Sequence, residues 1–189
     1  MQPEQALTQA VVVAARASAF LAERGEITVR NKDGSILLVE DEPDDVELAV
    51  RELAKLGVQG EVVVVEDGAE ALDYLFAQGQ YGGRDPRADP AVVLLDLMLP
   101  KIGGLEVLKR LRKHERTMLT PVVVLTSSQD DRDRAEAYSL GANSYVRKPL
   151  DSAEFERAVR QLGLLWLLVN QPPPDVGRAT PPPVGTRHR

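Results

Sequence analysis

The sequence has no cysteine and only two histidines, His114 and His188, among its 189 residues. The lack of thiols excludes disulfides, thiolate metal sites and cysteine nucleophiles, and it fits a reducing compartment. Two histidines do not suffice for a histidine-rich metal centre. Aromatic residues make up only 4% of the chain, so its core would consist mainly of valine, leucine and alanine.

Long apolar runs and a surplus of positive charge are also missing. No stretch approaches the roughly 20 apolar residues that a membrane span requires, and the N-terminus lacks the basic start of a signal peptide. The net charge of −6 argues against a general nucleic-acid-binding surface. We therefore expect a cytoplasmic protein that binds neither membrane nor nucleic acid.

Strand and helix patterns alternate five times between Ser35 and about Asn170. Short apolar runs bounded by turn residues predict buried strands, and each is followed by apolar residues at helical spacing. The expected strands cover 36–40, 61–65, 92–95, 121–125 and 144–146, and the expected helices begin near Pro43 and then cover 68–78, 104–114, 130–140 and about 151–170. This pattern predicts an α/β fold with a doubly wound parallel sheet of five strands.

Composition divides the chain into three parts. Residues 1–34 form an N-terminal extension whose alanine-rich stretch, 1–25, fits either a helix that packs on a partner or a mobile leader. Residues 35–170 form the domain. Residues 171–189 contain six prolines and are expected to be disordered, without a core of their own.

Polar residues follow the ends of four expected strands. They are Glu40 and Asp41 after the first, Asp96 after the third, Thr126 after the fourth and Lys148 after the fifth. The carboxyl ends of parallel strands meet at one edge of the sheet, where open α/β folds bind their ligands. Each residue alone fits a turn or helix-capping role, but their joint placement predicts a functional site.

Three carboxylates at that edge need a cation, because close carboxylates repel one another strongly. Oxygen ligands favour Mg²⁺, with Mn²⁺ as the alternative. Asp41 and Asp96 would bind directly and Glu40 through a water, and the backbone carbonyl of Met98 would complete the protein ligands. A metal-bound carboxylate can accept a phosphoryl group as an acyl phosphate, which the ammonium of Lys148 would stabilise.

Four motifs carry a resemblance to a known family. They are Leu38–Asp41, Leu94–Pro100 with Gly103 and Gly104 after it, Val124–Ser127, and Gly141–Pro149. On these motifs the chain, from residue 35 to about 166, resembles the receiver domain of two-component response regulators. The resemblance implies a flavodoxin-like receiver fold with strand order 2-1-3-4-5.

The resemblance also implies roles for individual residues. Asp96 would accept a phosphoryl group from a phosphohistidine of a sensor histidine kinase, and Glu40 and Asp41 would join it in holding Mg²⁺. Thr126 and Lys148 would bind the phosphoryl group.

Further implications concern the switch and the kinase. Thr126 and Tyr145 would form the switch pair, and the bond between Lys148 and Pro149 would be cis. The helix end at 73–76, the glycine-rich loop after it and the leucine-rich fifth helix resemble those of small single-domain regulators that serve bacterial phytochrome kinases. Glu40 stands where the wider family has aspartate, which alters the surroundings of the metal.

Output is expected to pass through contacts with another chain. The run 164–169 is entirely apolar, which is more than a helix with one buried face needs. We expect a homodimer through the fourth helix, the fifth strand and the fifth helix. Its expected contact residues are Leu162, Leu165, Trp166 and Val169. The alternative is a fifth helix that is wrapped by the N-terminal segment.

Other functions compete with phosphoryl acceptance. One is a phosphate-independent interaction module on the same fold. Another is a phosphatase of the haloacid-dehalogenase type, which needs a second acid two residues after the nucleophile, where Met98 stands. A flavodoxin-like cofactor binder would need a phosphate loop after the first strand. Met98 and the small Ser128 also predict slow self-dephosphorylation, and we expect no enzyme activity on a metabolite.

Overall fold

The computed structural model describes residues 35–56, 61–85, 88–149 and 151–171. Its five strands form one sheet in the order β2-β1-β3-β4-β5, and all neighbouring pairs are parallel. The strands are β1 (Ile36–Val39), β2 (Val62–Val65), β3 (Val92–Leu95), β4 (Val122–Thr126) and β5 (Ser144–Arg147). The predicted fold class and strand order are therefore confirmed.

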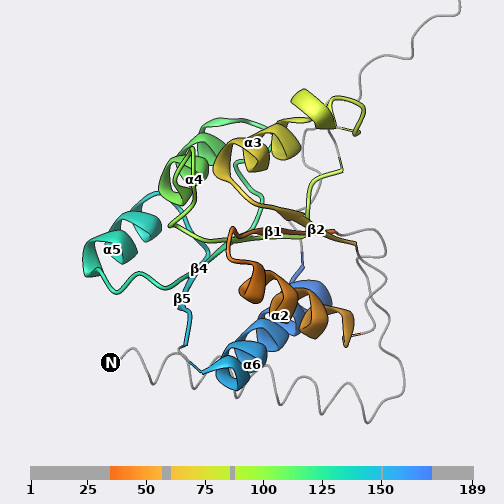
Figure 1. Ribbon diagram of the computed structural model, residues 1–189. Helices are drawn as coiled ribbons and strands as arrows, with labels where there is room; N and C mark the ends of the chain where they lie inside the picture. Colours follow the sequence, from red (N-terminus) through yellow and green to blue (C-terminus); the bar gives the residue numbers. More distant parts are fainter. Residues whose placement is uncertain (1–34, 57–60, 86–87, 150, 172–189) are drawn as a thin grey trace, which may run out of the picture.

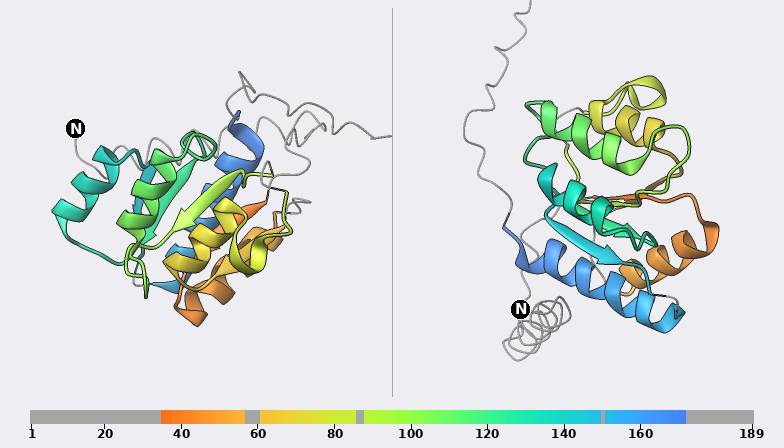
Figure 2. Two further views of the ribbon diagram at one scale, coloured as in Figure 1. Left: turned by 90° about the horizontal axis from the view of Figure 1, so that it is seen from above. Right: turned by 90° about the vertical axis from the view of Figure 1, so that its left-hand side faces the viewer.

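Helices cover both faces of this sheet, as Figures 1 and 2 show. They are α2 (Pro43–Ala54), α3 (Gly68–Phe76), α4 (Gly104–Lys113), α5 (Asp131–Ser139) and α6 (Ser152–Gly163), with a short 3₁₀ helix η1 (Gly79–Tyr81) and a π-helical end η2 (Leu164–Val169). The helices α2 and α6 lie on one face, and α3, α4 and α5 lie on the other. Side chains alternate along each strand between the two faces, so the sheet separates two main cores.

The larger strand residues show this division clearly. Leu37, Val39 and Leu95 pack with α3 and α4, whereas Ile36 and Leu38 pack with α2 and α6. All five are at most 2% exposed. Strands buried on both faces explain why the sequence shows continuous apolar runs instead of alternation.

The helix starts follow local chemistry that the sequence contains. Pro43 occupies the first turn of α2, where its missing N–H costs nothing. Asp67 caps α3 by accepting a hydrogen bond from the N–H of Glu70, and Asp151 caps α6 in the same way. These caps fix where each helix begins relative to the carboxyl edge of the sheet.

An ion cluster around one buried carboxylate joins α2 to α6. The carboxylate of Glu52 is fully buried and accepts hydrogen bonds from Arg160 and Lys55. The Nε of Arg160 lies 3.0 Å from Oε2 of Glu52. These bonds from Lys55 and Arg160 hold the pKa of Glu52 below its ordinary value of 4.5, against the opposing effect of burial. The pairing with Arg160 therefore ties together the two helices that cover this face.

A second polar network fixes the start of β5. The side-chain oxygen of Asn143 accepts hydrogen bonds from the N–H of Val122 at 2.8 Å and from Arg112 at 3.0 Å. Arg112 also donates to the carbonyl of Gly141 at 2.8 Å and to that of Thr120 at 2.9 Å. Burial lowers the pKa of Arg112. One side chain from α4 thus satisfies backbone groups of two separate loops.

The C-terminal end of the last helix is wider than an α-helix. Residues Leu164–Val169 form a π-helix, and the N–H of Asn170 donates to the carbonyl of Leu165 at 2.7 Å. Leu162 is 8% exposed and Leu167 is 4% exposed, and both belong to the core beneath α2 and α6. Leu162 was expected at a dimer interface; this is wrong, because the chain's own core buries it.

Two predicted segments lie outside the described residues. They are the N-terminal extension, including its alanine-rich part, and the proline-rich tail from residue 172 onward. Among the residues that the structure does describe, no helix combines the length and the apolar character that crossing a membrane requires.

Candidate functional site

The carboxyl edge of the sheet brings together the acids predicted from the strand ends. Glu40 and Asp41 follow β1, and Asp96 follows β3, which pairs with β1. One oxygen from each of the three carboxylates lies within 4.8 Å of the other two. Glu40 and Asp96 are 2% and 4% exposed, while Asp41 is exposed. The expected cluster therefore exists, with two of its acids buried.

Lys148 occupies the centre of this cluster. Its Nζ lies 2.7 Å from Oδ2 of Asp96, 2.6 Å from Oε2 of Glu40 and 2.9 Å from Oδ2 of Asp45. Its own backbone N–H donates to the carbonyl of Thr126 at 2.8 Å. The position of Lys148 at the end of β5 thus depends on pairing with β4, and its ammonium reaches across to the end of β1.

The electrostatics of the cluster follow from burial. Desolvation raises the pKa of Glu40 from 4.5 to about 7, although the hydrogen bond and charge of Lys148 oppose this rise. Burial alone would lower the pKa of Lys148, but its hydrogen bonds to Asp96, Glu40 and Asp45 hold that pKa above its ordinary value. Lys148 therefore stays a cation beside Glu40, whose charged form burial disfavours.

Thr126 and Tyr145 lie on the neighbouring strands β4 and β5. Thr126 is fully buried, and its hydroxyl oxygen accepts a hydrogen bond from the N–H of Ser128 at 3.3 Å. Tyr145 is half-buried and packs against Leu97 and Val124. Burial raises the pKa of its phenol. The two predicted switch residues therefore occupy adjacent strands on the same side of the site.

The loop between β3 and α4 holds Asp96 from the other side. The Oδ1 atom of Asp96 accepts a hydrogen bond from the N–H of Met98 at 3.0 Å, and the side chain of Met98 is 65% exposed. The start of α4 approaches so closely that a Cβ on Gly104 would lie 2.1 Å from the carbonyl oxygen of Asp96. A Cβ on Gly68 would likewise lie 1.9 Å from that of Ile102. Only glycine permits these approaches.

One backbone prediction for the site is wrong. No peptide bond within the described residues is cis, so the bond between Lys148 and Pro149 is trans and not cis as expected. The trans form is the intrinsically favoured one for bonds before proline, by about 0.5–1 kcal/mol. In this conformation Lys148 already reaches all three of its carboxylate partners.

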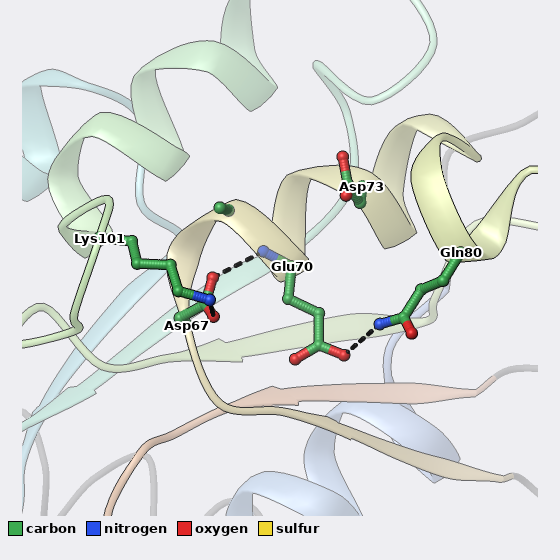
Figure 3. A pocket seen from close by; sticks show the side chains of 6 residues that line it. Asp67, Glu70, Asp73, Gln80 and Lys101 are labelled. Carbon is green, nitrogen blue, oxygen red and sulfur yellow. Dashed lines mark hydrogen bonds and ion pairs between the residues drawn. The ribbon is translucent and has the colours of Figure 1, made fainter.

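A shallow hollow of about 380 Å³ lies beside the start of α3 (Figure 3). Its Asp67 pairs with Lys101 and its Glu70 accepts a hydrogen bond from Gln80 at 2.7 Å. Burial would raise the pKa of Asp67, but Lys101 and the N–H of Glu70 lower it below its ordinary value. Because these acids are partnered, we interpret the hollow as structural: Lys101 ties the β3–α4 loop to α3.

The donor set of the cluster suits a hard divalent cation. Glu40, Asp41 and Asp96 offer carboxylate oxygens only, and oxygen ligands select Mg²⁺ or Mn²⁺ over softer metals. The carbonyl of Met98, in the loop after β3, stays a predicted ligand. The observed convergence of three oxygen donors supports a cation site at this edge.

Sequence reasoning missed the contact between Asp45 and Lys148. Asp45 stands in the first turn of α2, where the positive end of the helix favours an acid in any case. No sequence signal distinguishes it from Asp44 beside it, because the contact depends on a lysine 103 positions later in the chain.

The sequence is similar to a known domain family and to several known proteins. A family model described as the response regulator receiver domain matches residues 36–160. The probable methanogenesis regulatory protein FilR2 of Methanothrix harundinacea is 40% identical over 151 residues, which cover 80% of this chain and 95% of that protein. Response regulator Rcp1 of Synechocystis is 36% identical over 132 residues, which cover 70% of this chain and 88% of that protein.

Solved structures give the same result. The Mn²⁺-bound form of Rcp1 matches with a TM-score of 0.70 and 33% identity, covering 74% of this chain and 99% of that one. The phosphorylated cyanobacterial phytochrome response regulator RcpA matches with a TM-score of 0.71 and 35% identity, covering 75% of this chain and 99% of that one. The chain therefore belongs to the response regulator receiver domain family.

Proposed function

We propose that Asp96 accepts a phosphoryl group from a phosphohistidine of a sensor histidine kinase, and that the protein signals through the resulting change in its contacts. The observation that carries this proposal is the ammonium of Lys148, 2.7 Å from Asp96 and beside three clustered carboxylates. A nucleophilic carboxylate with a fixed cation and a metal-ligand set at one edge is what in-line phosphoryl transfer needs.

In the transfer, a carboxylate oxygen of Asp96 forms a bond to phosphorus while the bond from phosphorus to the kinase imidazole breaks. The imidazole leaves with the electron pair of that bond and takes up a proton. Mg²⁺ held by Glu40, Asp41, Asp96 and the carbonyl of Met98 would neutralise charge on the phosphoryl oxygens. Lys148 donates hydrogen bonds to the same oxygens.

The switch follows from the added charge. A phosphoryl group on Asp96 brings further acceptor oxygens to the edge of the sheet. Thr126 then exchanges its bond from the N–H of Ser128 for one to the phosphoryl group. The space that it vacates admits Tyr145, which alters the surface of α5, β5 and α6. A few kcal/mol of differential contact suffices for such a population shift.

The partner kinase is proposed to be a bacteriophytochrome. This proposal is supported by the likeness to RcpA, a cyanobacterial phytochrome response regulator. It is tested by mixing the protein with a candidate phytochrome kinase and labelled ATP. Transfer of label to the wild type and not to Asp96→Asn is expected, and equal labelling of both variants would contradict it.

Signalling is proposed to proceed through a homodimer that uses α5, β5 and α6. Tyr138 of α5 is 51% exposed and Val169 at the end of η2 is 40% exposed, while Leu165 and Trp166 are half-buried. These exposed apolar groups on α5 and at the end of η2 support an interface. Trp166→Glu is expected to sediment as a monomer, and a dimeric Trp166→Glu would refute the proposal.

Phosphoryl acceptance itself is tested with acetyl phosphate and Mg²⁺, followed by intact-mass measurement. The wild type is expected to gain one phosphoryl mass, and Asp96→Asn is not. A gain on both would place the group on another residue, and no gain on either would refute acceptance from small donors. Met98 carries no polar group that could orient an attacking water, so slow loss of the phosphoryl group is expected. Loss within seconds would contradict this.

The phosphatase alternative has little support from the site. Its proton-transfer acid would stand at position 98, where the exposed Met98 offers no titratable group. The phosphate-independent interaction module is eliminated if acetyl phosphate adds a phosphoryl group to the wild type and not to Asp96→Asn.

A further inference from the structure

Asp45 contacts Lys148 although it lies outside the candidate metal cluster. It stands in the first turn of α2, and its side chain is 27% exposed, with Oδ2 2.9 Å from Nζ of Lys148. The carboxylates that converge within 4.8 Å of one another are those of Glu40, Asp41 and Asp96. Asp45 therefore binds the ammonium from the rim of the site.

The ammonium of Lys148 has three N–H donors, and the structure gives it three carboxylate partners. Two of these, Glu40 and Asp96, are also the acids that a divalent cation would bind. A cation that binds these carboxylates competes with Lys148 for both of them. Asp45 is the partner that stays available.

We propose that Asp45 is a positioning residue, which holds the ammonium of Lys148 at the rim of the site when a divalent cation takes Glu40 and Asp96. Two effects follow. The anchor weakens the competition of Lys148 with the cation, and it keeps the ammonium where the incoming phosphoryl oxygens arrive. The second effect rests on the proposed phosphoryl acceptance by Asp96; the first does not.

A simpler role for Asp45 is that of an acid at the positive end of a helix. Asp44 has that same role, because both acids lie in the first turn of α2. Asp44 is exposed, and among the described residues it forms no ion pair with Lys148. Asp44→Ala thus removes the same charge from the same helix turn and is the matched control for Asp45→Ala.

The first test measures Mg²⁺ affinity by calorimetry on the whole chain. Asp45→Ala is expected to weaken Mg²⁺ binding about fivefold more than Asp44→Ala, since a partly exposed ion pair is worth about 1 kcal/mol. In a Lys148→Gln background the two alanine variants are expected to bind Mg²⁺ equally. Equal affinities in the natural background, or a difference that persists without Lys148, would overturn the proposal.

Because Lys148→Gln leaves the buried acids Glu40 and Asp96 without their cation, the folding of this variant must be checked by circular dichroism. If it does not fold, Asp45→Glu decides in the natural background. The longer carboxylate still reaches the ammonium, so Mg²⁺ affinity is expected to return to within about twofold of the wild type. Affinity as low as that of Asp45→Ala would overturn the proposal.

The second test measures the rate of phosphorylation by acetyl phosphate at saturating Mg²⁺. Asp45→Ala is expected to be about fivefold slower than Asp44→Ala, because the ammonium is less well placed. Equal rates would overturn the positioning of Lys148 for the phosphoryl group. A wild type that accepts no phosphoryl group refutes the proposed function, and the Mg²⁺ measurement then still decides the anchoring role of Asp45.

Discussion

At Gly104 the packing leaves no room for a side chain, and Gly104→Ala tests how tightly the end of β3 is held. The added carbon would lie 2.1 Å from the carbonyl oxygen of Asp96 and 2.8 Å from Cα of Leu97. Both obstacles are backbone atoms, which no rotamer change can remove. The start of α4 must therefore move away from the end of β3.

Overpacking of this kind costs about 1–3 kcal/mol. At about 2 kcal/mol, Gly104→Ala is expected to lower the melting temperature by roughly 6–10 °C. The shift also displaces the N–H of Met98, which bonds Asp96 at 3.0 Å, so the rate of phosphorylation by acetyl phosphate is expected to fall as well.

Differential scanning calorimetry measures the first effect, and Gly83→Ala is the matched control because no heavy atom lies within 4 Å of its added carbon. Gly83→Ala is expected to melt within about 2 °C of the wild type, as surface changes usually do. A Gly104→Ala protein that melts and reacts like Gly83→Ala would refute the claim that this approach positions Asp96.

Three further predictions concern other parts of the chain. Burial raises the pKa of Glu40 from 4.5 to about 7, so the contribution of this group to the stability of the metal-free protein is greatest below pH 4.5 and is lost as the pH rises through 7. Glu40→Gln is expected to flatten the pH dependence of the melting temperature between pH 5 and 8, and an unchanged dependence would contradict this. Arg160→Gln leaves the buried carboxylate of Glu52 with Lys55 alone. Urea is expected to unfold this variant at a lower concentration than Arg157→Gln, because Arg157 pairs at the surface. Equal unfolding midpoints would show that the pair of Arg160 with Glu52 contributes nothing to stability. Asn143→Ala removes the acceptor of the Val122 N–H and is expected to lower the free energy of unfolding by about 1–3 kcal/mol, measured by chemical denaturation. Asn143→Asp keeps an acceptor oxygen and is expected to lose less stability; the reverse order would refute this role for Asn143.

Topology made most of the site predictable from the sequence. The apolar runs ending at Val39, Leu95 and Leu125 are short and bounded by turn residues, which favours buried strands over helices. Parallel order then brings the residues after them to one edge, whatever their separation in the chain. The convergence of Glu40, Asp41 and Asp96 follows from this, without knowledge of a single side-chain contact.

Features that depend on how far a side chain reaches were not predictable. Asp45 gave no sign of its lysine partner, because that contact needs the relative placement of α2 and β5 to within an ångström. The close approaches at Gly68 and Gly104 depend in the same way on packing between elements. The intrinsic preference for the trans bond before proline is only about 0.5–1 kcal/mol, so the local sequence does not decide which isomer forms before Pro149.

The π-helical segment η2 makes the number of residues in it as important as their hydrophobicity. Leu162 and Leu167 are five residues apart, and an α-helix would place them about 140° apart around its axis. The wider turn of η2 brings both to the core, as the bond from Asn170 to Leu165 across five residues reflects. Deleting one residue between Leu164 and Val169 would restore the α-helical spacing, in which residues four apart share a face much as residues five apart do in a π-helix. The six apolar residues therefore include one more than an α-helix would need to bring Leu162 and the last buried leucine to the same core.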